Sequence, residues 1–137
     1  MSRASLEAVF CATTYRLDLP GGSIDLRIGC DSPAFDVFLR AQGVSCWGIV
    51  TACNPQAVRL SNGENQRRQA RLLARLAELG WLFFAACNLA DAGNWPPEPG
   101  CLILQVNEEK LRALAVEFSQ RAMVYGETGS PPRLLWI

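Results

Sequence analysis

Residues 46–53 read Cys46-Trp47-Gly48-Ile49-Val50-Thr51-Ala52-Cys53, an apolar run that stops at Asn54-Pro55. A short apolar run bounded by such turn residues predicts a buried strand. The polar segment 61–68, with the sequence SNGENQRR, follows after a loop. Ser61 and Glu64 have the Ser-x-x-Glu spacing of a capping box, so a helix should open here. We expect a functional site where this strand ends beside the start of that helix.

The helix predicted from Gly63 to Leu79 has an inward side and a charged side. At about 100° per residue, one arc carries the apolar residues and two amides, namely Leu72, Leu73, Leu76, Leu79, Asn65 and Gln69. The opposite side carries Arg68, Arg71, Arg75, Glu64 and Glu78, with Arg67 on the flank. The arginine stripe is typical of a solvated face. An unsatisfied buried amide costs about 1–3 kcal/mol, so Asn65 should either brace the loop 54–60 or contact a ligand.

Turn residues divide the rest of the chain into short elements. We expect one α/β domain over residues 1–137, with a mixed sheet and the order β-β-α-β-α-β-β-α-β-β. The expected strands are 13–19, 23–28, 46–53, 81–87, 101–106, 123–126 and 134–137, and the expected helices start at Ser32-Pro33, Gly63 and Asn107.

The strand–helix–strand segment 46–87 should form a parallel βαβ unit with a right-handed crossover. Asn54 and Asn88 would then lie at the carboxyl edge of the sheet, beside the helix that carries Asn65. Ligands of open α/β sheets usually bind at this edge, and a helix N-terminus there favours an anion.

The loop 88–100 carries Trp95 and Glu98 and should overhang the same edge. Glu98 could act as a general base or hold a ligand amine, with Trp95 as a lid. The alternative, which we favour, is that Trp95 fills the core and Glu98 pairs with an arginine such as Arg27.

Composition excludes several classes of function. The chain has 13 basic and 13 acidic residues, which supplies little long-range attraction for nucleic acid. Nucleic-acid binding through the stripe of Arg67, Arg68, Arg71 and Arg75 is therefore only a third alternative. It contains no histidine, so Ser-His-Asp and Cys-His catalysis are excluded within one chain. Its cysteines form no Cys-x-x-Cys pair and should be free thiols, so we expect no metal and no cofactor. The longest apolar run is too short to span a membrane, and we expect a cytoplasmic protein.

Several of these residues occur together in a known bacterial family. The chain resembles the family catalogued as domain of unknown function 3293 over about residues 12 to 137, through Tyr15, the run 51–55, Glu64-Asn65, Trp95 with Glu98, and Gln120 before Ala122. It departs from that family's pattern at Cys53, where an aromatic residue is usual, and after Glu98, where an acidic residue and a serine are usual. The resemblance supports the polar cluster and implies no particular activity.

Two functions remain open from the sequence. The first is binding of a small polar or anionic metabolite or nucleotide fragment at the sheet's carboxyl edge, by Asn54, Asn65, Arg67, Arg68, Asn88 and Glu98. The second is a non-catalytic interaction module, such as a homodimer, that uses the apolar C-terminal segment 134–137. That segment should pair with strand 123–126 or another strand and bury at least Leu135 and one neighbour, because exposing large apolar side chains costs about 1.5–3 kcal/mol each.

Overall fold

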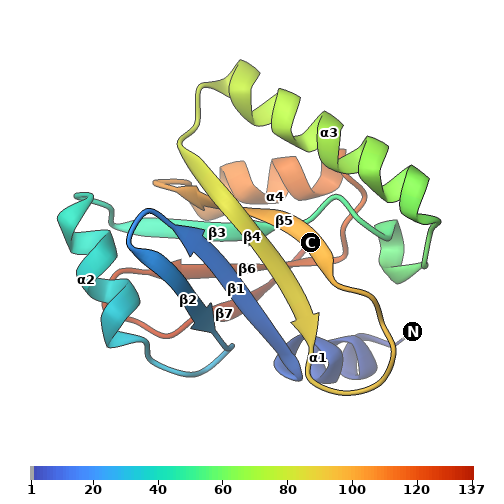
Figure 1. Cartoon of the computed structure of the whole chain (residues 1–137), viewed down its shortest axis with the longest axis horizontal. Helices are drawn as coiled ribbons and strands as arrows, with labels where there is room; N and C mark the ends of the chain where they lie inside the picture. The colour runs from blue at the N-terminus through green and yellow to red at the C-terminus, as the bar shows by residue number, and fades with distance from the viewer. Residues whose placement is uncertain (1) are drawn as a thin grey trace.

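The computed structural model describes residues 2–137 (Figure 1). Its strands are β1 (Thr13–Leu19), β2 (Gly22–Leu26), β3 (Cys46–Val50), β4 (Phe83–Ala90), β5 (Glu98–Leu104), β6 (Ala122–Glu127) and β7 (Arg133–Trp136). Its helices are α1 (Arg3–Cys11), α2 (Pro33–Ala41), α3 (Asn62–Leu79) and α4 (Glu108–Glu117), with a short 3-10 turn η1 (Pro55–Ala57). The three predicted helices and seven predicted strands are therefore all present, with shifts of a few residues at their ends, and α1 is additional.

Local capping explains where the helices begin and end. Ser32 accepts a hydrogen bond from the amide of Phe35 at the start of α2. Ser61 accepts one from the amide of Glu64 at the start of α3, so the predicted cap is confirmed. Gly80 ends α3 with a φ of 69°, in the left-handed region that suits glycine at this position.

All seven strands form one sheet, in the order β2-β1-β4-β5-β3-β6-β7, and every neighbouring pair is antiparallel. The predicted mixed sheet with a parallel βαβ unit is therefore wrong, because β5 lies between β3 and β4 and pairs with both. These two strands still run in the same direction, since each is antiparallel to β5. Their carboxyl ends consequently lie at the same edge of the sheet.

The segment from β3 to β6 has a recognisable topology. Its strands occur in the spatial order β4-β5-β3-β6, with α3 connecting β3 to β4 and α4 connecting β5 to β6. This is the split βαβ arrangement of ferredoxin-like folds. The hairpin β1–β2 extends the sheet beyond β4, and β7 extends it beyond β6.

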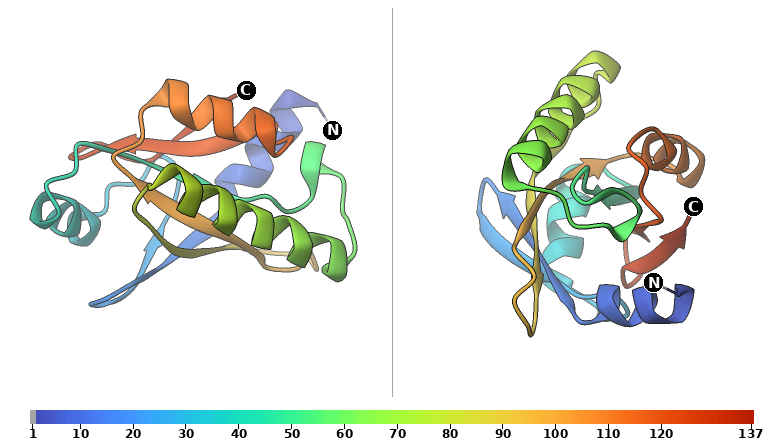
Figure 2. Two further views of the ribbon diagram at one scale, coloured as in Figure 1. Left: turned by 90° about the horizontal axis from the view of Figure 1, so that it is seen from above. Right: turned by 90° about the vertical axis from the view of Figure 1, so that its right-hand side faces the viewer.

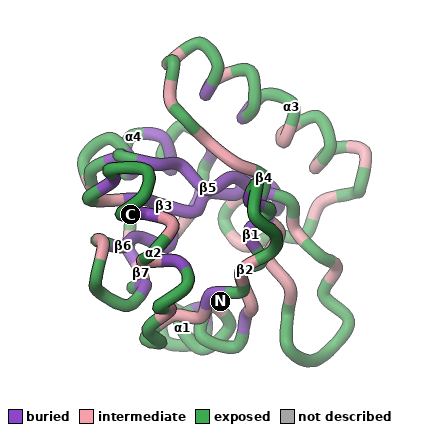
Figure 3. Tube along the Cα trace, turned by 60° about the vertical axis from the view of Figure 1, so that its left-hand side comes forward, coloured by how far each residue is buried: buried purple, intermediate pink, exposed green. Residues whose placement is uncertain are grey.

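The sheet has an apolar core on each of its two faces, formed with the helices that pack there. On one face, α3 and α4 pack over the central strands through residues such as Leu72, Leu76, Leu111, Leu114 and Phe118. On the other face, α2 packs through residues such as Phe35 and Leu39 against β1 and Trp47. Figure 2 shows α3 extending along and beyond its side of the sheet. Leu73 of α3 is accordingly 39% exposed, which corrects its predicted inward position, and only two positions of α3 are buried (Figure 3).

The two ends of the curled sheet approach each other near α1. The amide of Gly29, just after β2, donates to the carbonyl of Pro132, just before β7, at 2.8 Å. The guanidinium of Arg3 in α1 lies over the ring of Trp136 in β7, 4.5 Å from its centroid. α1 therefore lies between β1, which directly follows it in the chain, and the last strand.

The C-terminal strand pairs as predicted. β7 is antiparallel to β6, with Leu134 opposite Val124 and Leu135 opposite Met123. Leu135 is buried, whereas Leu134 and Trp136 are half-buried. The segment 134–137 is thus part of the sheet and one edge of it. Among the described residues, no helix combines the length and the apolarity that a membrane span requires.

Candidate functional site

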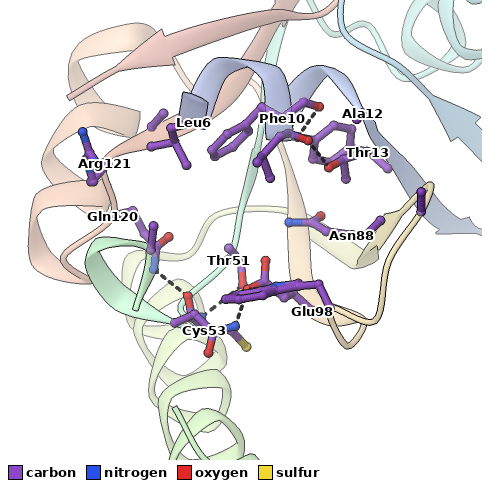
Figure 4. A pocket seen from close by; sticks show the side chains of 18 residues that line it. Leu6, Phe10, Ala12, Thr13, Thr51, Cys53, Asn88, Glu98, Gln120 and Arg121 are labelled. Carbon is purple, nitrogen blue, oxygen red and sulfur yellow. Dashed lines mark hydrogen bonds between the residues drawn. The ribbon is translucent and has the colours of Figure 1, made fainter. Parts of the chain in front are cut away.

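A pocket of about 310 Å³ opens where the carboxyl ends of β3 and β4 meet α1 (Figure 4). One wall is apolar and comes from α1 through Leu6, Val9 and Phe10. The opposite part is polar and includes Thr51, Asn54, Asn88 and Glu98. Trp95, from the loop between β4 and β5, lies at the rim and is 41% exposed.

The strand register places three polar side chains in a row across the pocket. Tyr15 on β1 is opposite Asn88 on β4, and Asn88 is opposite Glu98 on β5. Residues directly opposite on antiparallel strands have side chains on the same face, with Cβ atoms about 4.5–5.5 Å apart. The amide of Asn88 and the carboxylate of Glu98 are therefore neighbours. The order of the strands, which the sequence analysis did not predict, brings them together.

Asn54 is the centre of the hydrogen-bond network behind this row. Its Nδ2 donates to Oε2 of Glu98, and its Oδ1 accepts from the amide of Leu60 at 2.8 Å and from Nδ2 of Asn65 at 2.9 Å. Its own backbone amide donates to Oδ1 of Asn65 at 2.9 Å. The prediction that Asn65 points inward beside Asn54 is confirmed. Of the two roles considered for Asn65, the structure shows bracing of the loop.

Two further side chains hold the strand end that carries Cys53. Arg68 donates from Nε to the carbonyl of Ala52 and from Nη2 to that of Phe118, the latter at 2.6 Å. Gln120 donates from Nε2 to the carbonyl of Cys53 at 3.1 Å. Arg68 therefore packs against the protein, and its predicted place on the solvated side of α3 is wrong. The guanidinium can reach two carbonyls because its long side chain extends away from the helix axis.

The electrostatics of the pocket centre on Glu98. Both recorded donors, Nδ2 of Asn54 and Nε1 of Trp95, bond to its Oε2. Within residues 2–137, no donor bonds to its Oε1 and no arginine or lysine forms an ion pair with it. Burial raises the pKa of Glu98 above its usual value, and the two hydrogen bonds oppose this rise.

Two other groups of the pocket could become anionic, Tyr15 and Cys53, and both are held in the neutral form by burial. Burial raises the pKa of Tyr15 far above its usual range, and its hydroxyl donates to the carbonyl of Phe10 at 3.2 Å. Burial also raises the pKa of the Cys53 thiol. Neither group is therefore prepared to act as an anionic base or nucleophile.

The structure contradicts the favoured alternative for the loop before β5. Arg27 forms an ion pair with Asp91, not with Glu98, at 2.6 Å. Trp95 does not fill the core, because it lies at the rim of the pocket and the guanidinium of Arg59 lies 5.8 Å from its ring centroid. The ion pair Arg27–Asp91 leaves Glu98 free to face the pocket. Sequence reasoning could not choose between Asp91 and Glu98 as the partner of Arg27, because it placed both carboxylates in the same predicted loop 88–100.

The predicted site residues separate into three groups. Asn54, Asn88 and Glu98 line the pocket. Asn65 and Arg68 do not line the pocket. They lie behind its wall, where Asn65 bonds to the side chain of Asn54 and Arg68 bonds to the carbonyl of Ala52. Arg67 is exposed on α3 and does not line the pocket. The N-terminal end of α3 likewise contributes no lining residue, so the expected anion site at that helix end does not coincide with the pocket.

Sequence reasoning missed the α1 wall, because α1 has one buried residue, Leu6, and lacks a strong apolar period. Gln120 was marked by the family resemblance without a role. Arg121 also lines the pocket, and Figure 4 shows it across the pocket from Glu98. No signal in the sequence distinguishes Arg121 from the other arginines.

The part of the chain that the structure describes contains no cluster of three acidic or cysteine residues that could hold a metal. All six cysteines are free thiols, of which Cys53 and Cys101 are buried and Cys46 and Cys87 are half-buried. Cys11 and Cys30 are exposed. Cys53 is the only one of them among the pocket residues.

One comparison with known proteins gives a match. The family described as protein of unknown function (DUF3293) matches residues 50–123, which is more than half of the chain and includes Asn54, Asn88 and Glu98. The chain therefore belongs to this family. No curated protein and no solved structure matches the chain.

Proposed function

We propose that this member of the DUF3293 family binds a small molecule in the pocket between α1 and the carboxyl ends of β3 and β4. The observation that carries the proposal is the arrangement of the lining. Leu6, Val9 and Phe10 provide an apolar wall, and the polar groups of Asn88 and Glu98 converge opposite it. Ligand pockets typically combine mostly apolar walls with a few convergent polar groups, in volumes from about 300 Å³ upward.

The polar end of the pocket favours a ligand group that donates hydrogen bonds. Oδ1 of Asn88 is buried without a hydrogen-bond partner among the described residues. Buried polar atoms are normally satisfied, so an unpaired acceptor in a pocket supports occupation by a donor. The sequence-based expectation of an anionic ligand depended on Arg67, Arg68 and the N-terminal end of α3. Arg68 is committed to two carbonyls and Arg67 lies outside the pocket, so we propose a donor group as the better fit.

The rigid surroundings of the pocket also support binding. The network of Asn54 and Asn65 fixes the loop after β3, and Thr51 donates to the carbonyl of Pro99 at 3.0 Å, which joins the ends of β3 and β5. A site whose groups are held before a ligand arrives loses less conformational entropy on binding.

A thermal-shift screen against metabolites and nucleotides tests this proposal. A specific ligand at a hundred times its dissociation constant adds about 2.7 kcal/mol to the free energy of unfolding. Ala90 and Ala85 are both exposed on β4, but only Ala90 lines the pocket. Ala90→Phe should fill the pocket and abolish the stabilisation, whereas Ala85→Phe should retain it. A ligand that stabilises both variants equally would bind elsewhere and contradict the proposal.

A homodimer through β7 is the second candidate. Within the described part of the chain, β7 pairs only with β6, so it leaves one edge of the sheet open, and it carries the half-buried Trp136. An open strand edge can pair with a second copy of the same strand. Light scattering after size-exclusion chromatography would test this candidate, and a monomer at micromolar concentration would contradict it.

A further inference from the structure

We infer that the ligand of this pocket carries a cationic amine on a small apolar body, and that Glu98 is the counterion of the amine. This inference rests on the proposed function and specifies its ligand. It starts from the carboxylate of Glu98, which forms no ion pair with any arginine or lysine among residues 2–137. Glu98 receives hydrogen bonds from a neutral amide and a neutral indole, and both bonds use Oε2.

The position of Glu98 in the pocket suggests that its cationic partner comes from a ligand. Glu98 is half-buried, and carboxylates that are withdrawn from water are usually paired with a cation or bound to a metal. Each of the six ion pairs recorded for residues 2–137 joins an arginine to some other carboxylate, including Arg27 to the nearby Asp91. The pKa of Glu98 is raised by burial, which is the signature of a carboxylate without a cation beside it. An ammonium group at Oε1 would supply that cation.

The side-chain oxygen of Asn88, a second acceptor beside Glu98, also favours a ligand group with several N–H donors. Asn88 stands opposite Glu98 in the strand register, and its Oδ1 has no partner among the described residues. An ammonium has three donors and no acceptor, so one group could bond to both side chains. A hydroxyl has one donor and could satisfy only one of them. The two acceptors together therefore favour an amine over an alcohol.

The other charged and titratable groups around the pocket are compatible with an amine bound at Glu98. Arg121 lies across the pocket from Glu98 (Figure 4), and Arg59 lies over the Trp95 ring. Tyr15 and Cys53 are neutral because burial raises the pKa of each. The apolar wall of α1 then accommodates the body of the ligand, and the volume of about 310 Å³ suits a body no larger than one or two rings.

Three probes of similar size and different head groups test the inference. Phenethylamine is cationic, 2-phenylethanol is neutral and 3-phenylpropionate is anionic at neutral pH. Their dissociation constants can be measured by titration followed by heteronuclear NMR of the full chain. We expect phenethylamine to bind at least ten times more tightly than 2-phenylethanol, and 3-phenylpropionate to bind most weakly. We expect Glu98→Gln, which keeps an acceptor for Asn54 and Trp95, to reduce the ratio of amine to alcohol affinity to about one.

Glu109→Gln is the matched control, because Glu109 is exposed on α4 and does not line the pocket. It removes the same charge and should leave the tenfold ratio unchanged. Equal affinity for amine and alcohol, or tighter binding of the propionate, would overturn the inference and leave the proposed pocket intact. If none of the three probes shifts the pocket resonances, the proposed function and the inference both fail. The comparison of probes on the wild-type protein remains decisive even if Glu98→Gln does not fold.

Discussion

The side chain of Asn54 connects three segments that are far apart in the sequence. It bonds to Glu98 of β5, to Leu60 of the loop and to Asn65 of α3. It is 3% exposed, so none of these bonds is replaced by water in the folded state. Its backbone has a φ of 48°, in the left-handed region that asparagine tolerates better than most residues.

Replacing Asn54 should therefore destabilise the whole fold. We expect Asn54→Ala to lower the free energy of unfolding by about 2–4 kcal/mol, because several buried partners lose their bonds. Asn54→Gly also removes the side chain but adopts positive φ without strain, so it should be about 1 kcal/mol less damaging. Urea denaturation measures both changes. A loss below 1 kcal/mol in both variants would show that the network is not needed for stability.

Glu98 should make stability depend on pH in a direction opposite to that of a salt-bridged carboxylate. Its pKa is raised in the folded protein, so the folded state binds its proton more readily than the unfolded state does. Stability from this group is therefore fully present below the ordinary glutamate pKa, near about 4.3, and is lost as pH rises through the folded pKa. The prediction is that wild type loses stability relative to Glu98→Gln between about pH 4 and neutrality. Thermal melts of both proteins across this range check it, and a difference that grows in favour of wild type would contradict it.

Among the elements, β3 and β5 approach closely at the pocket because β5 has a glycine at the right place. A Cβ on Gly100 would lie 2.4 Å from the carbonyl oxygen of Val50, a backbone atom that cannot rotate away. This approach also allows Thr51 to bond to the carbonyl of Pro99, next to Glu98. Gly100 thus sets the distance between the two strands that carry most of the polar end of the pocket.

Gly100→Ala should consequently separate these strands. We expect the free energy of unfolding to fall by about 3 kcal/mol and Thr51 to be displaced. The reason is that neither the added Cβ nor the carbonyl oxygen of Val50 can move away without a shift of its strand. Gly21→Ala is the control, since a Cβ there meets nothing within 4 Å. Its stability should stay within about 1 kcal/mol of wild type. Equal stability of the two variants, measured by chemical denaturation, would refute this account of the β3–β5 contact.

Local sequence signals predicted the elements, while the pairing of strands depended on contacts that the sequence does not display. Ser32, Ser61, Gly80 and Asn107 mark helix ends through bonds within a few residues, and these ends are confirmed. The rule that a strand–helix–strand unit closes in parallel failed, because β5 returns by a hairpin and takes the place beside β3. Of the predicted site residues, Asn54, Asn88 and Glu98 line the pocket, because their positions depend only on strand ends that share an edge. Arg67 and Arg68 do not line the pocket, and the α1 wall was not predicted, because these features depend on side-chain reach and on tertiary packing.

In the whole molecule, β7 completes the sheet and extends the core. Leu135 is 2% exposed and belongs to the core beneath α4, and the amide of Ile137 donates to the carbonyl of Arg121 at 3.1 Å. Arg121 also lines the pocket. The end of the chain therefore supports both the core and the strand start next to the pocket.

Deletion of residues 134–137 should make the protein insoluble or strongly destabilised. The loss of one fully buried leucine and two half-buried side chains costs several kcal/mol at about 1.5–3 kcal/mol per fully buried residue. Ile137→Ala, at a residue that is 42% exposed, is the milder control and should retain the fold. Differential scanning calorimetry and light scattering measure the result. An unchanged melting temperature and oligomeric state in the deletion would refute the structural role of β7.

Heteronuclear NMR during a fragment screen tests most directly whether the pocket between α1, β3 and β4 is a binding site. We expect bound fragments to shift the side-chain amide of Asn88, the indole of Trp95 and the backbone amides near Thr51 together, and we expect Ala90→Phe to abolish these shifts. Fragments that bind nowhere, or that bind only outside this pocket, would contradict the proposed site. A second pocket, lined among others by Glu7, Ile28 and Trp136, is one place where such outside binding would be seen.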